Sequence, residues 1–472
     1  PLQTQSVSYV VQRMNSLCAM FYMLSILFYA RFRLSQRQRN KWWLFSGCIL
    51  AGALALASKQ IAATLPVFIM VYEWYFFRDL DLKWLKNHIP LLAGCLLLAA
   101  VIALALLGSN PLDRVLAGYK GRDFTLTQRL LTEPRVILFY LSQLLWPHPS
   151  RLNLDHDFPL SNSLMDPMTT IYSIITITAL IGLAVVTVRK QRLLSFCILW
   201  FFGNLVIESS IIPLEIIFEH RIYLPSMAFS LMVALAACRW VKPTWLQAVL
   251  LCIMVTAGAI WTYERNTVYS DRVTFWQDCV DKSPRKARPH NNLGVALADQ
   301  GYHDEAIEKY HKALEIDPLY QDSVTNIGLS LAEQGKIKES ITQFLKALEI
   351  NPKDSKTLNN LGAALIVEKR YIEAIQHLSE ALTTDPYYAQ AHNNMGVALQ
   401  YQGRLEEAIE HFSMAVLYKP DYTQAYINLG NILASQERYE EAIEQFSTAL
   451  KINPDHKVAR FNLEMSLKAI NQ

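Results

Sequence analysis

A cluster of ionisable residues lies between two long apolar runs near the middle of the chain. The stretch FEHRIYLPS at 218–226 carries Glu219, His220 and Arg221 in consecutive positions, and Glu215 precedes it. A guanidinium group can hold a phosphate through paired, charge-assisted hydrogen bonds, and a neighbouring carboxylate can orient it. The pattern therefore suggests a site that holds a charged ligand at a membrane face. A solvated surface loop is the alternative interpretation.

Two further cations stand within or beside apolar sequence. Arg13 and Lys59 are candidates for the same site, because ionisable residues at membrane depth are costly and usually functional. A hairpin turn at headgroup level is the alternative for Lys59. For Arg13 the alternative is a charge that snorkels from a helix end.

Two Asp-x-Asp motifs occur, DLD at 79–81 and DHD at 155–157. Such pairs hold a metal ion in enzymes that use sugar nucleotides, but the pattern is short and arises by chance. We interpret 79–81 as a solvated loop, and keep Asp155 and Asp157, together with His220, as candidates for a sugar or acceptor site. No metal site is predicted. The sequence has no P-loop, GxGxxG, HExxH or GxSxG motif.

The first 264 residues contain the apolar segments that must position these side chains. Each is close to the ~20 residues that a helix needs to cross the hydrocarbon layer, and the predicted spans are 7–30, 42–57, 60–77, 88–107, 169–188, 193–211, 222–239 and 244–263. The stretch 135–146 is too short to span and is predicted to be re-entrant or interfacial. Residues 108–168 are predicted to form a long loop segment.

The short loops between these spans predict an orientation. Basic residues gather at 31–41, 78–86, 189–192 and 239–242, which fall on one side if the spans alternate. By the positive-inside rule that side is cytoplasmic. Lys59, segment 108–168, the Glu219–Arg221 cluster and the soluble half would then lie on the non-cytoplasmic side. That side is the periplasm, an organelle lumen or the cell exterior.

Charge and cysteine usage exclude several classes. The net charge of +3 combines a basic apolar half with an acidic soluble half, so the overall balance does not indicate a nucleic-acid partner. Six of the seven cysteines fall in apolar spans and Cys279 stands alone. No CxxC or CxxH pattern occurs, so neither a zinc site nor a disulfide framework is predicted.

The second half repeats every 34 residues. Pro284, Pro318, Pro352, Pro386, Pro420 and Pro454 recur at that spacing, and an Asn-apolar-Gly triplet recurs in phase with them. This period is typical of tetratricopeptide repeats, pairs of helices that stack into a solenoid. We predict a connector at 265–286, five repeats over 287–456 and a capping helix at 457–472.

One position recurs as a polar residue in every repeat, although it lies inside a predicted helix; we call these residues the asparagine column. Asparagine, a poor helix former, recurs as Asn292, Asn326, Asn360, Asn394, Asn428 and Asn462. A stacked column of amides can pair with a peptide backbone of any sequence, and the array resembles the superhelix of O-GlcNAc transferases, which has such a ladder. The alternative is that the column serves the scaffold alone.

Four stretches resemble one family: QTQSVSYVVQRMNSLCAMFY (3–22), ALASKQIAATLPVFIMVYEWYF (55–76), LNLDHDFP (152–159) and FEHRIYLPSMAFSLM (218–232). With the repeats, they look like the transmembrane-and-tetratricopeptide-repeat O-mannosyltransferases and their bacterial relatives. The resemblance implies an all-α chain, with a polytopic GT-C membrane domain followed by an α-solenoid. It also implies transfer of a sugar, possibly mannose, from a polyprenyl-phosphate carrier to a polypeptide that the repeats recruit.

On this resemblance, Arg221, Glu219, Lys59 and Arg13 bind the carrier phosphate. The carrier-linked sugar is the donor substrate, and no other cofactor is expected. Two features depart from the family: Gln60 stands where Glu often follows the lysine, and the catalytic Asp of the first non-cytoplasmic loop is expected upstream of Pro1. The catalytic residue is therefore not assigned. The chief alternative function is a non-catalytic, membrane-anchored scaffold that gathers protein partners, and a transporter is a weaker third.

Overall fold

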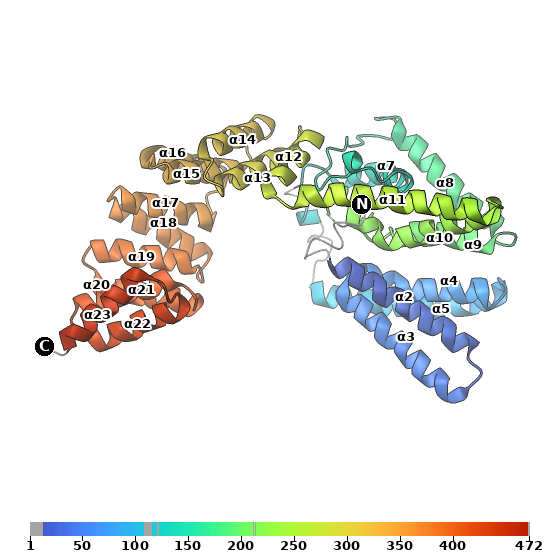
Figure 1. The fold of residues 1–472 in the computed structure, drawn as a ribbon, viewed down its shortest axis with the longest axis horizontal. Helices are drawn as coiled ribbons and strands as arrows, with labels where there is room; N and C mark the ends of the chain where they lie inside the picture. The colour runs from blue at the N-terminus through green and yellow to red at the C-terminus, as the bar shows by residue number, and fades with distance from the viewer. Residues whose placement is uncertain (1–12, 108–115, 120–121, 211, 213, 471–472) are drawn as a thin grey trace. The chain divides into compact units, whose positions relative to one another are not determined.

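The computed structural model describes residues 13–107, 116–119, 122–210, 212 and 214–470. Within these ranges every regular element is a helix, which confirms the all-α class. The chain divides into two compact units, Pro1–Ser283 and Pro284–Gln472. Figure 1 shows the long helices of the first unit and the short paired helices of the second.

Long apolar helices make up most of the first unit. Five of its described helical segments are long and apolar enough to cross a membrane: Met14–Leu34, Gln38–Ser58, Thr169–Thr187, Glu219–Trp240 and Thr244–Tyr269. The α-helices of this unit are α2 Arg13–Leu34, α3 Gln38–Ser58, α4 Leu65–Phe76, α5 Leu82–Leu107, α7 Leu126–Leu145, α8 Thr169–Thr187, α9 Arg192–Gly203, α10 Tyr223–Trp240, α11 Thr244–Tyr269 and α12 Arg272–Lys282.

Three helices differ in length from the sequence prediction. The expected spans 60–77 and 193–211 contain α-helices of only 12 residues each, α4 and α9. At 1.5 Å per residue, each covers only about 18 Å of the ~30 Å hydrocarbon layer. Helix α7 begins nine residues before the predicted stretch 135–146, because a capping box at Thr125 and Gln128 starts it and Pro134 is accommodated inside it.

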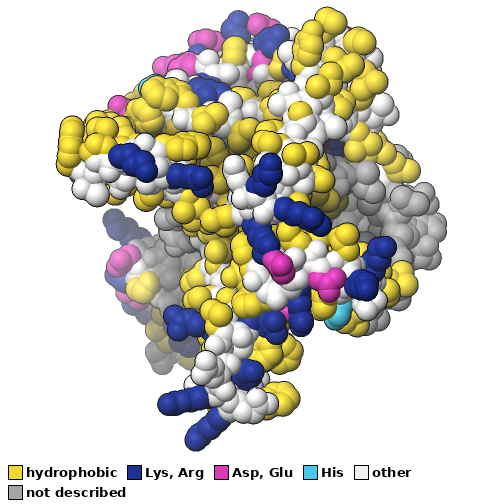
Figure 2. All heavy atoms as spheres, turned by 90° about the vertical axis from the view of Figure 1, so that its right-hand side faces the viewer, with side chains coloured by type: hydrophobic (Ala, Val, Ile, Leu, Met, Phe, Trp, Pro, Cys, Tyr) yellow, Lys and Arg dark blue, Asp and Glu magenta, His cyan; other side chains and the backbone are white. Residues whose placement is uncertain are grey.

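The basic turns of this unit gather at one end. Figure 1 shows the turns after α2, α4, α8 and α10 at the same end. Figure 2 looks onto that end, where Lys and Arg side chains far outnumber Asp and Glu. The turn at Lys59 comes directly after α3, and the 3₁₀ helix η4 (Glu219–Ile222) comes directly before α10. Both therefore lie at the ends of the helices opposite the basic turns. By the positive-inside rule, this basic end of the unit is the one predicted to face the cytoplasm.

The second unit is a stack of helix pairs. They are α13 Ala287–Ala298, α14 His303–Ile316, α15 Gln321–Glu333, α16 Ile337–Ile350, α17 Ser355–Val367, α18 Tyr371–Thr384, α19 Ala389–Tyr401, α20 Leu405–Tyr418, α21 Thr423–Ser435 and α22 Tyr439–Ile452, followed by α23 Lys457–Ile470. Each helix packs against the next along the chain. In each repeat the glycine of the triplet lies against a large side chain of the paired helix.

The contact at Gly396 shows why this position is glycine. A Cβ atom there would lie 2.7 Å from the ring of Phe412, which is fully buried. The absent side chain lets α19 and α20 approach closely enough for the ring to fill the space between them. The buried side chains of α16 to α22 form one continuous apolar core, as expected for a solenoid.

A pair of histidines connects α19 and α20. The Nδ1 atoms of His392 and His411 are 2.9 Å apart, and Nε2 of His392 lies 3.1 Å from the carbonyl oxygen of Pro386. If the Nε2–H of His392 donates to that carbonyl, its Nδ1 accepts from the Nδ1–H of His411. Burial lowers the pKa of His411, and the positive charge that His392 could carry lowers it further, while Glu410 and Glu407 act in the opposite sense.

This pair predicts acid sensitivity of the repeats. Since the pKa of His411 is lower in the folded state, the unfolded chain binds more protons below about pH 6.5. The stability that His411 contributes is therefore complete above pH 6.5 and is lost as the pH falls below it. We expect the melting temperature of a fragment 284–472 to decrease between pH 7.5 and 5, with a flatter profile for His411→Gln. A parallel profile for the variant would contradict the assignment.

Candidate functional site

The FEHR segment is folded into the interior of the first unit. It forms η4, and the exposed fractions of Glu219, His220 and Arg221 are 1%, 8% and 2%. These charges therefore do not lie in an open surface loop. Because burying a charge without partners is prohibitive, Glu219 and Arg221 must be compensated by the protein around them.

Glu219 is compensated by three groups from distant parts of the chain. Its Oε1 accepts the backbone N–H of Asn153 at 2.6 Å and lies 3.3 Å from Nε2 of His156. Its Oε2 lies 3.8 Å from Nη2 of Arg265, which is itself 1% exposed. The carboxylate thereby connects η4, the 149–157 loop and α11.

Arg265 extends this network toward α12. It donates to the carbonyl of Leu152 at 2.9 Å and to Asp278 at 3.4 Å. Lys282 bonds the same carbonyl at 3.0 Å and the Asp278 carboxylate at 2.7 Å. The loop is consequently held by cations on the last membrane span, α11, and on α12, which follows it.

The DHD motif lies in this loop and is held mainly by its backbone. The hydroxyl of Ser283 donates to the carbonyl of Asp155 at 2.6 Å and accepts the N–H of Asp157 at 2.9 Å. Asp155 is buried and Asp157 is half-buried. Both residues therefore lie on the loop that contacts Glu219. His156, which stands between them in the sequence, makes one of these contacts. No group of three or more metal-ligating side chains occurs in the described ranges.

Arg221 holds the turn that precedes it. Its guanidinium donates to the carbonyl of Ile216 at 2.9 Å and to that of Glu215, and lies 5.5 Å from the ring centre of Phe218. Tyr140 of α7 secures the same turn, since its hydroxyl donates to the carbonyl of Phe218 at 3.1 Å and accepts its N–H at 2.9 Å. Arg221 therefore has a structural task beside any role toward a ligand.

Lys59 meets a carboxylate that sequence analysis did not single out. Its Nζ lies 2.7 Å from Oε1 of Glu208, and the side chains are 15% and 2% exposed. Oε2 of Glu208 and Nδ1 of the stacked, buried His220 have no hydrogen-bond partner among the described residues. His220 lies within electrostatic range of both Lys59 and Arg221. Buried polar atoms without partners indicate an unfilled requirement for a ligand or water.

A second buried ion pair lies in α7, between Arg129 and Glu133 at 2.8 Å. Arg129 also donates to the carbonyls of Glu208 at 2.8 Å and Ser210 at 2.9 Å. Burial raises the pKa of Glu133, while the charges of Arg129 and Arg221 oppose that shift. Arg129 thus fixes the segment that carries Glu208.

These observations assign the predicted residues to two groups. Lys59 pairs with Glu208 and, like Arg221, lies within electrostatic range of His220, whereas Glu219 contacts the loop of Asp155 and Asp157 and lies beside Arg265. Arg13 begins α2, but its side chain lies outside the part of the chain that the structure describes. Sequence analysis missed Glu208, Glu133, Arg129 and Arg265, although an ionisable residue next to or inside apolar sequence is the signal that selected Lys59.

The asparagine column is half-buried and bonded between repeats. Its amides donate to asparagines of the preceding repeat: Asn326 to Asn291, Asn394 to Asn359 and Asn428 to Asn393, each at 2.9 Å, and Asn462 to Asn431 at 2.7 Å. The acceptors of the first three bonds are buried. The column therefore has a scaffold role, and each amide keeps a second N–H for another partner.

Comparison with known proteins supports both halves of the sequence interpretation. Residues 2–106 match the family described as dolichyl-phosphate-mannose-protein mannosyltransferase, and tetratricopeptide families match 287–320, 328–366, 353–416 and 423–456. The chain joins a mannosyltransferase-like segment to a tetratricopeptide array. This confirms the resemblance drawn from the sequence. The mannosyltransferase match contains Lys59 and ends before the FEHR segment.

Three individual proteins are similar to parts of this chain. Protein O-mannosyl-transferase Tmtc3 of Drosophila melanogaster is 24% identical over 371 residues, which cover 67% of this chain and 39% of the relative. The chain therefore spans well under two thirds of that protein. The crystal structure of YrrB, described as a TPR protein with an unusual peptide-binding site, is 25% identical, with 39% of this chain and 96% of that chain covered at a TM-score of 0.32. MamA is 24% identical, with 34% and 95% covered at a TM-score of 0.31.

The Glu219–Arg265 contact predicts a strong dependence of stability on charge balance. Arg265→Gln leaves Glu219 buried without its cation, which typically costs about 3–5 kcal/mol. Adding Glu219→Gln removes the uncompensated charge and should recover part of the loss. Melting temperatures of the two single variants and the double variant in detergent measure this coupling. Arg239→Gln, at an exposed position at the end of α10, is the control. Additive effects of the two changes would contradict the pairing.

Proposed function

We propose that this chain is part of a membrane glycosyltransferase that transfers mannose from a polyprenyl-phosphate carrier to a polypeptide recruited by the repeats. One observation carries the proposal: Lys59, in the segment that matches the mannosyltransferase family, pairs with the buried Glu208 at the end of an apolar helix, and His220 lies within electrostatic range of Lys59 and Arg221. A lipid-linked phosphate approaches from the membrane, so its binding group must lie at such an end. The repeats would lie on the same, non-cytoplasmic side.

Within this proposal, Lys59 is the primary contact of the carrier phosphate. It is the partly exposed cation of the group, and an ammonium with three N–H donors can keep Glu208 while binding a phosphate oxygen. Arg221 adds positive charge from the buried side. During transfer the bond between the sugar and the phosphate oxygen breaks, the acceptor hydroxyl bonds to the sugar carbon, and its proton leaves. Fixed cations favour this step by stabilising the negative charge of the departing phosphate.

Glu219 acts indirectly in this proposal. Its oxygens are taken by Asn153, His156 and Arg265, so it positions the loop of Asp155 and Asp157. That loop is our candidate for the sugar or acceptor side of the site. Arg13, at the start of α2, keeps its proposed phosphate role.

The scaffold alternative is favoured by a specific observation. The contacts of Glu219 and Arg221 are internal to the protein, as expected if these charges only fasten a membrane anchor. In that case the spans hold the repeats at the membrane and substitutions at Lys59 change no reaction. The two functions are distinguished by the transfer assay that follows.

Lys59 substitutions in the full-length protein test the phosphate role. We expect Lys59→Ala to reduce transfer from a radiolabelled polyprenyl-phosphate mannose to peptide by about 10²–10³-fold, as for loss of one transition-state donor. Lys59→Arg should retain part of the rate. Gln60→Ala, at the exposed neighbouring position, is the control. Unchanged rates in a folded Lys59→Ala variant would refute the role, and no transfer by the unaltered protein from any such donor would favour the scaffold.

The asparagine column gives an independent test of acceptor recruitment. Asn326, Asn360 and Asn394 changed together to Ala should weaken polypeptide binding by one to three orders of magnitude, at roughly 0.5–1.5 kcal/mol for each lost hydrogen bond. Because two of these amides also bond a neighbouring repeat, some loss of melting temperature is expected as well. Asn453→Ala, at an exposed helix end, is the control. Unchanged affinity in the folded triple variant would leave the column a scaffold feature.

A further inference from the structure

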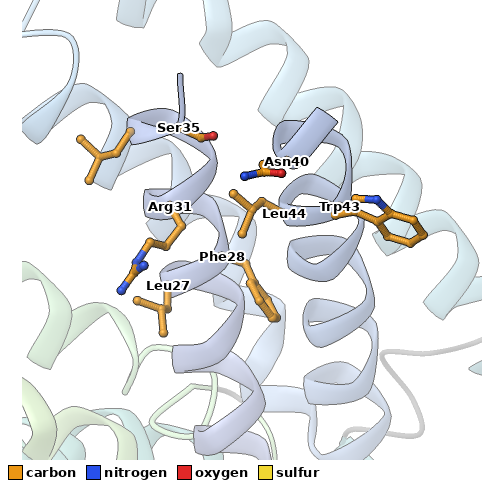
Figure 3. A pocket seen from close by; sticks show the side chains of 8 residues that line it. Leu27, Phe28, Arg31, Ser35, Asn40, Trp43 and Leu44 are labelled. Atoms are coloured by element: carbon orange, nitrogen blue, oxygen red, sulfur yellow. The ribbon is translucent and has the colours of Figure 1, made fainter. Parts of the chain in front are cut away.

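A pocket of about 790 Å³ lies at the tip of the α2–α3 hairpin, at the basic end of the first unit. Figure 3 shows Phe28 and Leu44 between the two helices, with Leu27 and Arg31 on one side and Trp43 on the other. Asn40 and Ser35 stand nearest the turn. The pocket thus has an apolar floor and a polar rim.

The floor is built by close packing of the two helices. A Cβ atom at Gly47 would lie 3.1 Å from the ring of Phe28, so the glycine lets this ring sit against α3. One turn nearer the tip, Phe32 and Phe45 pack with ring centres 5.4 Å apart. These contacts fix the two walls relative to each other without filling the space beside Arg31.

The tip of the hairpin carries an excess of positive charge. No Asp or Glu precedes Glu73 in the sequence, whereas Arg31, Arg33, Arg37, Arg39 and Lys41 surround the turn. Glu73 binds Arg33 at 2.8 Å, and Arg33 lies over the ring of Phe77. Arg31 lies on the exposed side of α2, lines the pocket, and has no carboxylate partner among the described residues. Arg31 therefore gives the pocket a positive charge that an anionic ligand can neutralise.

The position of the tip selects the kind of anion. Both helices are long and apolar enough to cross a membrane, so their shared turn lies where headgroups lie. Trp42 and Trp43 are 68% and 75% exposed, and tryptophan is typical of that interface. Below the pocket α2 exposes Leu27, Met23 and Met20 in succession. A molecule with an anionic head and an apolar tail would place its head beside Arg31 and its tail along these exposed apolar side chains.

We propose that this pocket binds one anionic membrane phospholipid. The guanidinium of Arg31 pairs with the phosphodiester, and the Asn40 amide donates to a phosphate or ester oxygen. The acyl chain lies along Leu27, Met23 and Met20, the apolar side chains that α2 exposes below the pocket. The site is separate from the Lys59 group, at the opposite end of the helices, and does not depend on the proposed transfer reaction.

Lipid retention by the intact protein tests the proposal. The protein is extracted from bilayers that contain phosphatidylglycerol and phosphatidylcholine, and the lipid that remains bound is measured by mass spectrometry. We expect phosphatidylglycerol to be enriched about tenfold over the bilayer ratio, as for one charge-assisted pair. Arg31→Gln together with Asn40→Ala should remove most of this enrichment, and Arg31→Lys should keep part of it.

Arg189→Gln provides the matched control, because it removes one exposed charge from another basic turn of the same end. It should leave the enrichment unchanged. Three results would overturn the proposal: no enrichment in the unaltered protein, equal loss in Arg189→Gln, or displacement of the lipid by inorganic phosphate alone. The first would leave the pocket to a protein partner, the second would indicate unspecific surface charge, and the third would indicate a free-phosphate site. Circular dichroism confirms that each variant is folded.

Discussion

The buried carboxylate of Glu219 is the constraint on which the architecture of the first unit depends. An ionised group removed from water must recover several kcal/mol from its surroundings, and Glu219 does so from Asn153, His156 and Arg265. These partners come from a long loop and from the last membrane span, so satisfying one charge fixes three segments. Apolar contacts alone would allow those segments to slide, whereas hydrogen bonds to a single carboxylate have a defined geometry.

The buried charges on the other side of η4 also have partners, but some polar atoms there do not. Arg221 and Tyr140 secure the turn before the helix, and Lys59 neutralises Glu208. Here, however, Oε2 of Glu208 and Nδ1 of His220 are left without partners in the described part of the chain. Both carboxylate oxygens of Glu219 therefore have partners, whereas Oε2 of Glu208 has none; Nε of Arg265, beside Glu219, is also buried without a partner among the described residues. The unpartnered oxygen of Glu208 supports our proposal that a ligand binds on the Lys59 side.

Sequence alone predicts those features that repeat or that violate composition. The 34-residue period predicts the solenoid because every unit solves the same packing problem, seen at Gly396 and Phe412. Lys59 and Arg221 were identified because charge is rare beside membrane spans. The pairing of Lys59 with Glu208 could not be predicted, since 149 residues separate them and either could have faced water. Arg265 was missed for a similar reason: at the end of a span it resembles an ordinary interfacial charge. The start of α7 was misplaced because only the apolar stretch 135–146 was considered, whereas a capping box at Thr125 begins the helix in polar sequence.

The two ends of the membrane unit treat cations in opposite ways, and the bilayer accounts for the difference. At the basic end, Arg31, Arg37 and Arg39 are exposed, and no acidic residue precedes Glu73 to compensate them. Such charges are stable there because headgroups and water surround them. At the other end, Arg129, Arg221 and Arg265 are buried and bonded to carbonyl groups, and two of them also pair with carboxylates. A cation buried in this way costs stability unless its geometry is held, so selection for anchoring alone would favour moving it outward. Its place inside the protein, next to polar atoms without partners among the described residues, supports our proposal that this end binds a ligand.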